Sequence, residues 1–369
     1  MTGPALSRGG KMRREWMRDV AQMNAMDPGH VSAEDLAAMT PLERRRFDRA
    51  RRRFLKAGPL IFTSLANDVF EQLQVAIKAD EAGSSESNDM LLLSGPAGVG
   101  KSKIANTLAA WWYYECIHFE ADDRGVDPQS LMEFPDFVPV VRISLPGAVT
   151  PRELFELICE FLDAPIGVTI TNLRRAAEHA LREAGTRLLV IDEVQALRFE
   201  GKSSRDTHNT LRHFVNMSGL TFVAVGHMMV EILDKPLDDD QADKTRVMLL
   251  ERTTSFQVGP LLHGTEERWN EWVDVLEILE ERFRLVAAEP GWLSDTHAAY
   301  VYQTTLGYFK PLISLLSRAN ALAIDTGKEA VDRDILDRSP IERGKAVGRT
   351  RRVEMLDRGL WQFIDPRNI

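Results

Sequence analysis

Eight consecutive residues have the types and spacing of a loop that binds phosphate. The segment 95–102 reads GPAGVGKS and fits the pattern G-x-x-x-x-G-K-[ST]. Glycines let the backbone curl so that successive N–H groups point at phosphate oxygens. A helix that begins there adds the positive end of its dipole. The sequence therefore predicts a P-loop that binds ATP with Mg²⁺, through Gly95, Pro96, Ala97, Gly98, Val99, Gly100, Lys101 and Ser102.

Within this loop, two side chains have roles of their own. The Lys101 ammonium is expected to reach the β- and γ-phosphates, and the Ser102 hydroxyl to coordinate Mg²⁺. An apolar run at 90–93 precedes the loop, and helical spacing follows it. This strand–loop–helix context is the one that the motif requires, which argues against a chance match.

Adjacent carboxylates follow a second apolar run. Asp192 and Glu193 come directly after the residues LLVI at 188–191. An apolar strand that ends in acids is common by itself, but here it follows the P-loop by about ninety residues, with a strand and a helix between. Asp192 is therefore predicted to bind the nucleotide's Mg²⁺, directly or through water, and Glu193 to polarise the water that attacks the γ-phosphate. The sequence thus predicts an ATPase.

His227 and Arg252 are further candidates for catalysis. His227 follows the apolar run at 220–226 and can hydrogen-bond the γ-phosphate or the water. The alternative is a structural role, which is the more common one for a histidine in a loop. Arg252 is a candidate arginine finger that reaches the γ-phosphate of a neighbouring subunit, with Arg246 as the fallback. The alternative for Arg252 is a surface ion pair with Glu251 or with an aspartate of the preceding loop.

Lys310 is the last catalytic candidate. It lies at the start of a helix that follows Gly307, from which its ammonium can reach the nucleotide and couple a helical domain to ATP. Arg318, on the same helix, is the second choice. Both residues are equally compatible with a position on the surface.

Strand and helix signals alternate through the middle of the chain. A helix also begins at a capping box, Thr150 to Glu153, with proline at its first helical position. Strands separated by helices predict right-handed crossovers and a parallel α/β sheet with helices on both faces. The expected strands are 90–93, 138–145, 187–192 and 220–226, and the other expected helices are 101–117, 172–184 and 205–217.

Four regions are predicted along the chain. Residues 1–57 form a basic N-terminal arm and helix, and residues 58–262 form the P-loop core. Strand signals stop near 264, and helical spacing then predicts a small C-terminal helical lid domain at 263–340. The Arg-rich tail 341–369 contains an apolar patch, LWQFI at 360–364, that either docks on a partner or packs on the body.

Composition excludes several classes of protein. The 369 residues are 44% hydrophobic and 27% charged, which is incompatible with disorder throughout the chain. Two cysteines cannot build a disulfide framework or a cysteine-rich metal site, and they favour the reducing cytoplasm. No apolar run is long enough to span a membrane, and the first residues lack the apolar segment of a secretory signal.

The charge is distributed unevenly. Residues 1–57 contain 13 Lys and Arg against 7 Asp and Glu, a formal charge of +6, whereas the whole chain carries −9. The remainder therefore carries −15. A basic arm on an acidic body predicts an anionic partner, of which nucleic acid is the usual one, and the alternative is a solvated helix face.

With these residues assembled, the chain resembles the AAA+ ATPases of the TniB/TnsC type, which regulate target choice in DNA transposition. Beyond the P-loop, the resemblance rests on FVPVV at 137–141, LFELI at 154–158 and LDAP at 162–165. It extends through DEVQAL at 192–197 and NTLR at 209–212, and the helix at 314–323 resembles the family's sensor II segment. Overall it covers about 40–340.

Two positions depart from that family's pattern. The fourth strand of the family usually ends in Val-Gly-Thr, whereas this chain has Val-Gly-His at 225–227. The family's Gln-Leu-x-x-Arg-Phe block is replaced by MLLERT at 248–253. These departures touch His227 and Arg252, the two residues whose roles depend most on the resemblance.

The resemblance implies an ATP-dependent regulator of transposition. Such a protein binds duplex DNA without sequence preference, assembles as a ring or filament and recruits a transposase. A second hypothesis is a nucleotide-gated protein-binding switch with little hydrolysis. A third is a helicase loader or another AAA+ remodeller, because P-loop cores serve many tasks.

Overall fold

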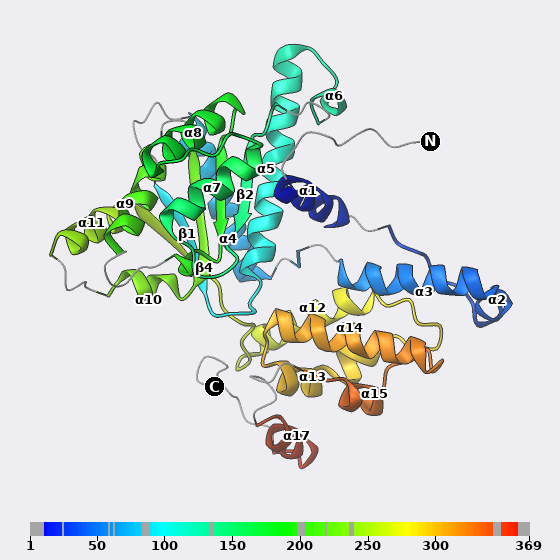
Figure 1. Ribbon diagram of the computed structural model, residues 1–369. Helices are drawn as coiled ribbons and strands as arrows, with labels where there is room; N and C mark the ends of the chain where they lie inside the picture. Colours follow the sequence, from blue (N-terminus) through cyan, green and yellow to red (C-terminus); the bar gives the residue numbers. More distant parts are fainter. Residues whose placement is uncertain are drawn as a thin grey trace. The chain divides into compact units, whose positions relative to one another are not determined.

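The computed structural model describes most of the chain. The described residues are 11–23, 26–57, 60–61, 63–82, 89–132, 136–197, 204–217, 220–235, 240–341 and 348–360. They divide into two compact units (Figure 1). The first takes those within 1–20, 66–97 and 101–258, and the second those within 21–65, 98–100 and 259–369. The predicted apolar patch lies outside the described residues from 361 onward.

A five-stranded parallel sheet forms the centre of the first unit. Its strand order is β2-β3-β4-β1-β5, and each neighbouring pair runs parallel. The four predicted strands are confirmed to within two residues at each end. The strands are β1 (Met90–Gly95), β2 (Val140–Ser144), β3 (Leu188–Asp192), β4 (Thr221–His227) and β5 (Thr253–Gln257).

Helices cover both faces of this sheet. The chain crosses from β1 to β2 in one direction along the sheet, and the later crossovers return in the other. Right-handed connections therefore place α5 on one face and α7, α8 and α9 on the opposite face (Figure 1). The helical segments are α1 (Lys11–Met23), α4 (Ser64–Ala82), α5 (Lys101–Arg124), α6 (Pro128–Met132), α7 (Pro151–Leu162), α8 (Ile170–Glu183), the 3-10 turn η1 (Val194–Ala196), α9 (Ser204–Val215), α10 (Met229–Leu233) and α11 (Asp240–Leu250).

Burial explains which strands the sequence predicts and which one it misses. Every residue of β1 and β3 is buried, as is all of β4 except its last residue, so these strands appear as continuous apolar runs. By contrast, β5 is an edge strand with one buried residue, Phe256, among three exposed ones. Its sequence TTSFQ has no apolar run to predict it.

The first helix belongs to the first unit through one aromatic side chain. Trp16, 3% exposed, packs edge-on against Tyr113 of α5 at 5.8 Å between ring centroids, and also contacts Phe161 of α7. The predicted basic arm therefore contains a helix that packs by its apolar side. None of the described helices has the length and apolar character of a membrane span.

The second unit is helical. Its core surrounds Trp272, which is fully buried and donates its indole N–H to the Ala298 carbonyl at 3.1 Å. Leu312, Leu315, Leu316 and Ala319 pack there at the predicted helical spacing. The elements are α2 (Ala33–Ala38), α3 (Pro41–Lys56), α12 (Glu266–Glu280), the π-helical turn η3 (Trp292–Thr296), α13 (Ala298–Thr305), α14 (Phe309–Asp325), α15 (Arg333–Arg338) and α17 (Arg349–Asp357).

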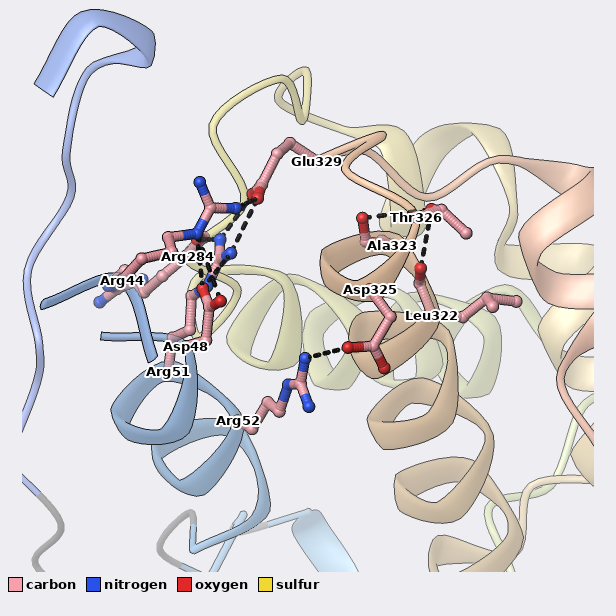
Figure 2. A network of polar contacts seen from close by, with 10 residues as sticks. All are labelled: Arg44, Asp48, Arg51, Arg52, Arg284, Leu322, Ala323, Asp325, Thr326 and Glu329. Atoms are coloured by element: carbon pink, nitrogen blue, oxygen red, sulfur yellow. Dashed lines mark hydrogen bonds and ion pairs between the residues drawn. The ribbon is translucent and has the colours of Figure 1, made fainter. Parts of the chain in front are cut away.

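A network of buried charges fixes α3 within this unit (Figure 2). Thr40 and Glu43 cap the helix reciprocally, and Pro41 is its first residue. Arg51 is fully buried and donates to both carboxylate oxygens of Glu329, at 2.5 and 2.8 Å. It also donates to Asp48 at 2.6 Å and to the Arg284 carbonyl at 2.9 Å. Such a pair is costly to break, because a remaining partner keeps a buried charge.

We expect Arg51→Met to destabilise the second unit by about 3 kcal/mol, because Glu329 then loses its bidentate partner in a buried position. The double variant Arg51→Met/Glu329→Met should recover much of this loss, since it removes both charges. Urea denaturation of the full chain, followed by circular dichroism, measures both effects. Arg53→Met on the same helix is the control: its side chain is exposed, so its midpoint should stay close to that of the parent chain.

Candidate functional site

The carboxyl ends of three central strands meet at one edge of the sheet. In β1, Gly95 is aligned with His227 of β4, and Asp192 of β3 is aligned with Val225 of the same strand. Since β4 lies between β1 and β3, the predicted residues Asp192, Glu193 and His227 flank the start of the P-loop. In open α/β sheets, ligands bind at this edge.

The P-loop begins at a position where only glycine fits. Gly95 has φ +148°, and a Cβ atom built there would lie 2.0 Å from the carbonyl oxygen of Val258. Gly98 and Gly100 also have positive φ, at +85° and +105°. Positive φ at two near positions curls the loop, and Lys101 then begins the 24-residue helix α5.

Lys101 is buried among neutral oxygens. The residue is 9% exposed, and its ammonium donates to the carbonyls of Gly95 and Pro96, each at 2.8 Å. Burial lowers the pKa of this ammonium, and the charges of Glu193 and Asp192 raise it only in part. A phosphate oxygen would stabilise this cation more than the carbonyls do, because it carries a full charge. The residues present therefore fit a nucleotide phosphate.

Asp192 and Glu193 differ in their surroundings. Asp192 is 3% exposed, and its Oδ2 accepts a hydrogen bond from Arg142 of β2 at 2.8 Å. Its Oδ1 accepts the Glu193 N–H at 2.9 Å. Glu193 has φ +60° in the left-handed region, which is costly for a residue with a side chain, and its carboxylate is exposed. The Asp192 carboxylate is thus held in place, where its oxygens can serve as metal ligands. The Glu193 carboxylate is exposed at the end of the strand.

Gln195 joins the Glu193 carboxylate to the end of β4. Its Nε2 donates to Glu193 Oε2, and its Oε1 accepts the backbone N–H of His227 at 2.9 Å. The second bond fixes which end of the amide faces Glu193. Gly226 makes the approach possible, because a Cβ atom there would lie 2.8 Å from Gln195 Oε1 and 2.4 Å from Met229 Cγ.

His227 itself contributes a backbone contact and an unpaired ring nitrogen. Its Nδ1 is buried and has no hydrogen-bond partner among the described residues. Beside it, the Ser94 hydroxyl of β1 accepts the N–H of Met229 at 2.9 Å, which holds the turn that follows His227. An unpaired buried nitrogen near the P-loop is available to a ligand.

Arg252 lies at the opposite end of the strands, where β1 begins. Its carbonyl accepts the N–H of Met90, the first residue of β1, at 2.7 Å, whereas the P-loop follows the last residue of β1. The length of that strand, about 20 Å, separates the two. Its guanidinium donates to the side chain of Asn216 at 2.6 Å rather than to Glu251. Arg252 therefore lies far from the P-loop of its own chain.

The fallback residue Arg246 is held inside the first unit. It is 7% exposed and donates to the Leu233 carbonyl at 2.6 Å and to Asp243 at 2.7 Å. The bond to Leu233 connects α11 to α10, whereas the bond to Asp243 lies within α11.

Lys310 contacts a P-loop residue through its backbone. Its N–H donates to the Gly98 carbonyl at 2.9 Å, a bond within the second unit, and its side chain is exposed. Arg318, the second choice, donates to the Pro340 carbonyl. Roles for the Lys310 and Arg318 side chains toward the nucleotide stay predictions.

Sequence reasoning missed three residues of this region. Arg142 interrupts the apolar run of β2 with a charge, which could have indicated a buried ion pair. Ser94 is a fully buried polar residue at the end of β1, and such a position needs a hydrogen-bond partner. Gln195 carries no sequence signal of its own, because its contacts depend on how β3 and β4 align.

Comparisons with known proteins agree with this architecture. Residues 84–231 match the sequence profile of a family described as an AAA domain. No match was found among curated proteins. Among solved structures, the Aeropyrum pernix ORC1 protein in complex with DNA is 18% identical, with 83% of this chain and 71% of that chain covered at a TM-score of 0.55.

Two further structures cover somewhat less of the chain. The Aeropyrum pernix ORC2 protein is 14% identical over 74% of this chain and 66% of its own, with a TM-score of 0.49. Cdc6p from Pyrobaculum aerophilum is 18% identical over 72% of this chain and 63% of its own, also with a TM-score of 0.49. At these identities the likeness concerns the fold. From the parallel sheet, the P-loop and the matched profile, we conclude that the chain has the fold of the AAA+ P-loop NTPases, with the AAA-domain match over residues 84–231.

Proposed function

We propose that the chain is an ATP-dependent regulator of DNA transposition: it binds and hydrolyses ATP, assembles as a homo-oligomer on target DNA and recruits a transposase. The observation that carries the proposal is the arrangement of Lys101, Asp192 and Glu193 at one edge of the parallel sheet. The segments that resemble TniB/TnsC-type regulators support the choice of process. A protein of the same fold in complex with DNA is consistent with a DNA partner.

In this proposal the P-loop holds the nucleotide. Backbone N–H groups of the loop and the N-terminus of α5 face the phosphates, and Lys101 exchanges its carbonyl partners for phosphate oxygens. The Ser102 hydroxyl and the Asp192 carboxylate are hard oxygen donors of the kind that Mg²⁺ prefers. When bound, Mg²⁺ supplies charge neutralisation of the phosphates.

Glu193 is the base in this proposal. Its exposed carboxylate accepts a proton from the water that attacks the γ-phosphate. Gln195 holds this carboxylate at the end of β4, next to His227. A change at the γ-phosphate would therefore alter the contacts at this strand end. We infer that Gln195 positions Glu193 and that Arg252 acts on the nucleotide of a neighbouring copy, since it lies far from its own.

A specific observation favours a second candidate function. The contact of Gln195 with Glu193 can also withhold the carboxylate from water. Hydrolysis would then be slow, and the chain would act as a nucleotide-gated protein-binding switch. The two candidates differ in whether duplex DNA stimulates phosphate release.

We expect Glu193→Gln to lower the rate of ATP hydrolysis at least about 100-fold while ATP still binds, because the amide cannot accept the proton. Lys101→Ala should lose ATP binding itself. Isothermal titration calorimetry measures binding, and phosphate release with and without duplex DNA measures turnover. Normal hydrolysis by the Glu193→Gln variant would contradict the assignment of the base, and tight ATP retention without release by the parent chain would favour the switch.

We expect Gln195→Ala to lower kcat roughly tenfold with little change in KM, because Glu193 loses its orientation but the phosphate contacts remain. In Gln195→Glu, an oxygen can still accept the His227 N–H, but the new charge faces Glu193. Repulsion between the two carboxylates should move Glu193 out of its orientation, so kcat should fall in this variant as well. A rise in turnover on Gln195→Ala would show that Gln195 withholds Glu193.

We expect Arg252→Ala to retain ATP binding and to lose roughly 1,000-fold in turnover, provided that the active site is shared between copies. Mixing equal amounts of the Arg252→Ala and Glu193→Gln variants should then restore about a quarter of the parent activity, since about a quarter of the sites in a head-to-tail assembly are intact. Absence of any restoration, with co-assembly verified by light scattering, would place the function of Arg252 within its own chain.

A further inference from the structure

The cations of α3 divide into a set that binds the chain's own carboxylates and a set that does not. At 100° per residue, five of its cations fall within a sector of about 100°. We call this set the basic face, and it consists of Arg45, Arg46, Arg49, Arg53 and Lys56. All five side chains are exposed. Across the part of the chain that the structure describes, none of them makes an ion pair or a side-chain hydrogen bond.

The other three arginines of α3 form ion pairs with carboxylates of the same chain. Arg44 donates to Asp48 at 3.1 Å and to Glu329 at 2.5 Å. Arg51 is fully buried against the same two carboxylates, and Arg52 donates to Asp325 at 2.6 Å (Figure 2). These contacts set the rotation of α3 about its axis within the second unit. The basic face is therefore directed outward by a fixed set of bonds.

The chemistry of the basic face fits a dense row of phosphates. The positions 45–56 extend over about 16 Å of helix, and duplex DNA carries one negative charge per roughly 1.7 Å of its axis. Four of the five cations are arginines, whose planar guanidinium binds phosphate oxygens in pairs. The face has no Asn or Gln side chain to recognise adenine edges. We assign its arginines, which could also pair with guanine, to phosphates, and phosphate contacts carry no sequence information.

The negative charge of the rest of the chain limits where DNA can bind. The formal charge of −9 for the whole chain is incompatible with general attraction to DNA, so a basic surface has to be local. The helix is also capped and packed before binding, so little conformational freedom is lost when a ligand arrives.

We propose that the basic face of α3 is the surface through which this protein binds the phosphate backbone of duplex DNA. The proposal rests on the proposed function, to which it adds the surface used and the absence of base recognition. Each of the five cations then replaces a condensed counterion, so that binding weakens as salt concentration rises.

The test compares the full chain with Arg45→Gln/Arg49→Gln/Arg53→Gln, in the presence of ATP and Mg²⁺. Fluorescence anisotropy of a labelled duplex is measured from about 50 to 200 mM salt. The slope of log K against log salt should become less steep by about 3, one for each lost phosphate contact. Near 0.1 M salt, where each contact contributes nearly tenfold, the affinity should fall roughly 100- to 500-fold.

Two control variants separate local charge from other effects. Arg175→Gln/Arg182→Gln/Arg268→Gln removes the same charge from exposed positions on α8 and α12, and it should keep the parent slope. Arg45→Lys/Arg49→Lys/Arg53→Lys preserves the charge and should keep most of the slope. All variants should melt like the parent chain by circular dichroism, because the replaced side chains are exposed.

The outcomes distinguish this proposal from the function on which it rests. If the parent chain binds DNA and the α3 glutamine variant keeps its slope, the basic face is not the DNA surface and the proposed function stands. If the parent chain does not bind duplex DNA in any nucleotide state, both fail. A preference of the parent chain for one duplex sequence, or unchanged DNA binding by the α3 variant together with loss of an acidic protein partner, would overturn the proposal.

Discussion

The turn at Ser94 and Gly95 is the constraint on which the nucleotide site depends. The Gly95 carbonyl accepts hydrogen bonds from Lys101 Nζ at 2.8 Å and from the Met228 N–H at 3.3 Å. The Ser94 carbonyl accepts the Val258 N–H at 2.9 Å, and Val258 leaves no room for a side chain at position 95. Two residues thus connect the P-loop, the end of β4 and the exit from β5. Any displacement of the end of β1, an interior strand that is buried throughout, would therefore move all three.

The acidic side of the site is held by a different kind of contact. Asp192 forms a buried ion pair with Arg142, whereas Glu193 is exposed and joined through Gln195 to the β4 backbone. A buried carboxylate requires a partner, and Arg142 fulfils this requirement before any metal arrives. The exposed carboxylate of Glu193 needs no such partner, because water solvates it. Its contact with Gln195 therefore fixes its orientation. In the proposed mechanism, Asp192 would thus serve as a rigid ligand and Glu193 as a base whose orientation Gln195 sets.

The sequence predicts the parts of this structure that are determined locally. The P-loop, the apolar strands β1, β3 and β4, and the capping box of α7 are all predicted from neighbouring residues. The edge strand β5 is not, because three of its five side chains face solvent and no apolar run marks it. Contacts that depend on strand alignment or on distant residues are also hidden: Gln195 meets His227 across 32 positions, and Arg51 meets Glu329 across 278.

The contacts of the basic arm at residues 1–57 are hidden from the sequence for the same reason. Composition alone shows an excess of Lys and Arg in residues 1–57, but it cannot separate those that bind the chain's own carboxylates from those that remain exposed. Arg49 and Arg51 are two positions apart, yet one is exposed and the other is fully buried. Helical geometry turns these two side chains about 200° apart, so the burial of one directs the other to solvent. An internal ion-pair network on a basic helix thus determines which cations stay exposed on the proposed binding face, and a charge count alone would overstate the number of cations available to a partner.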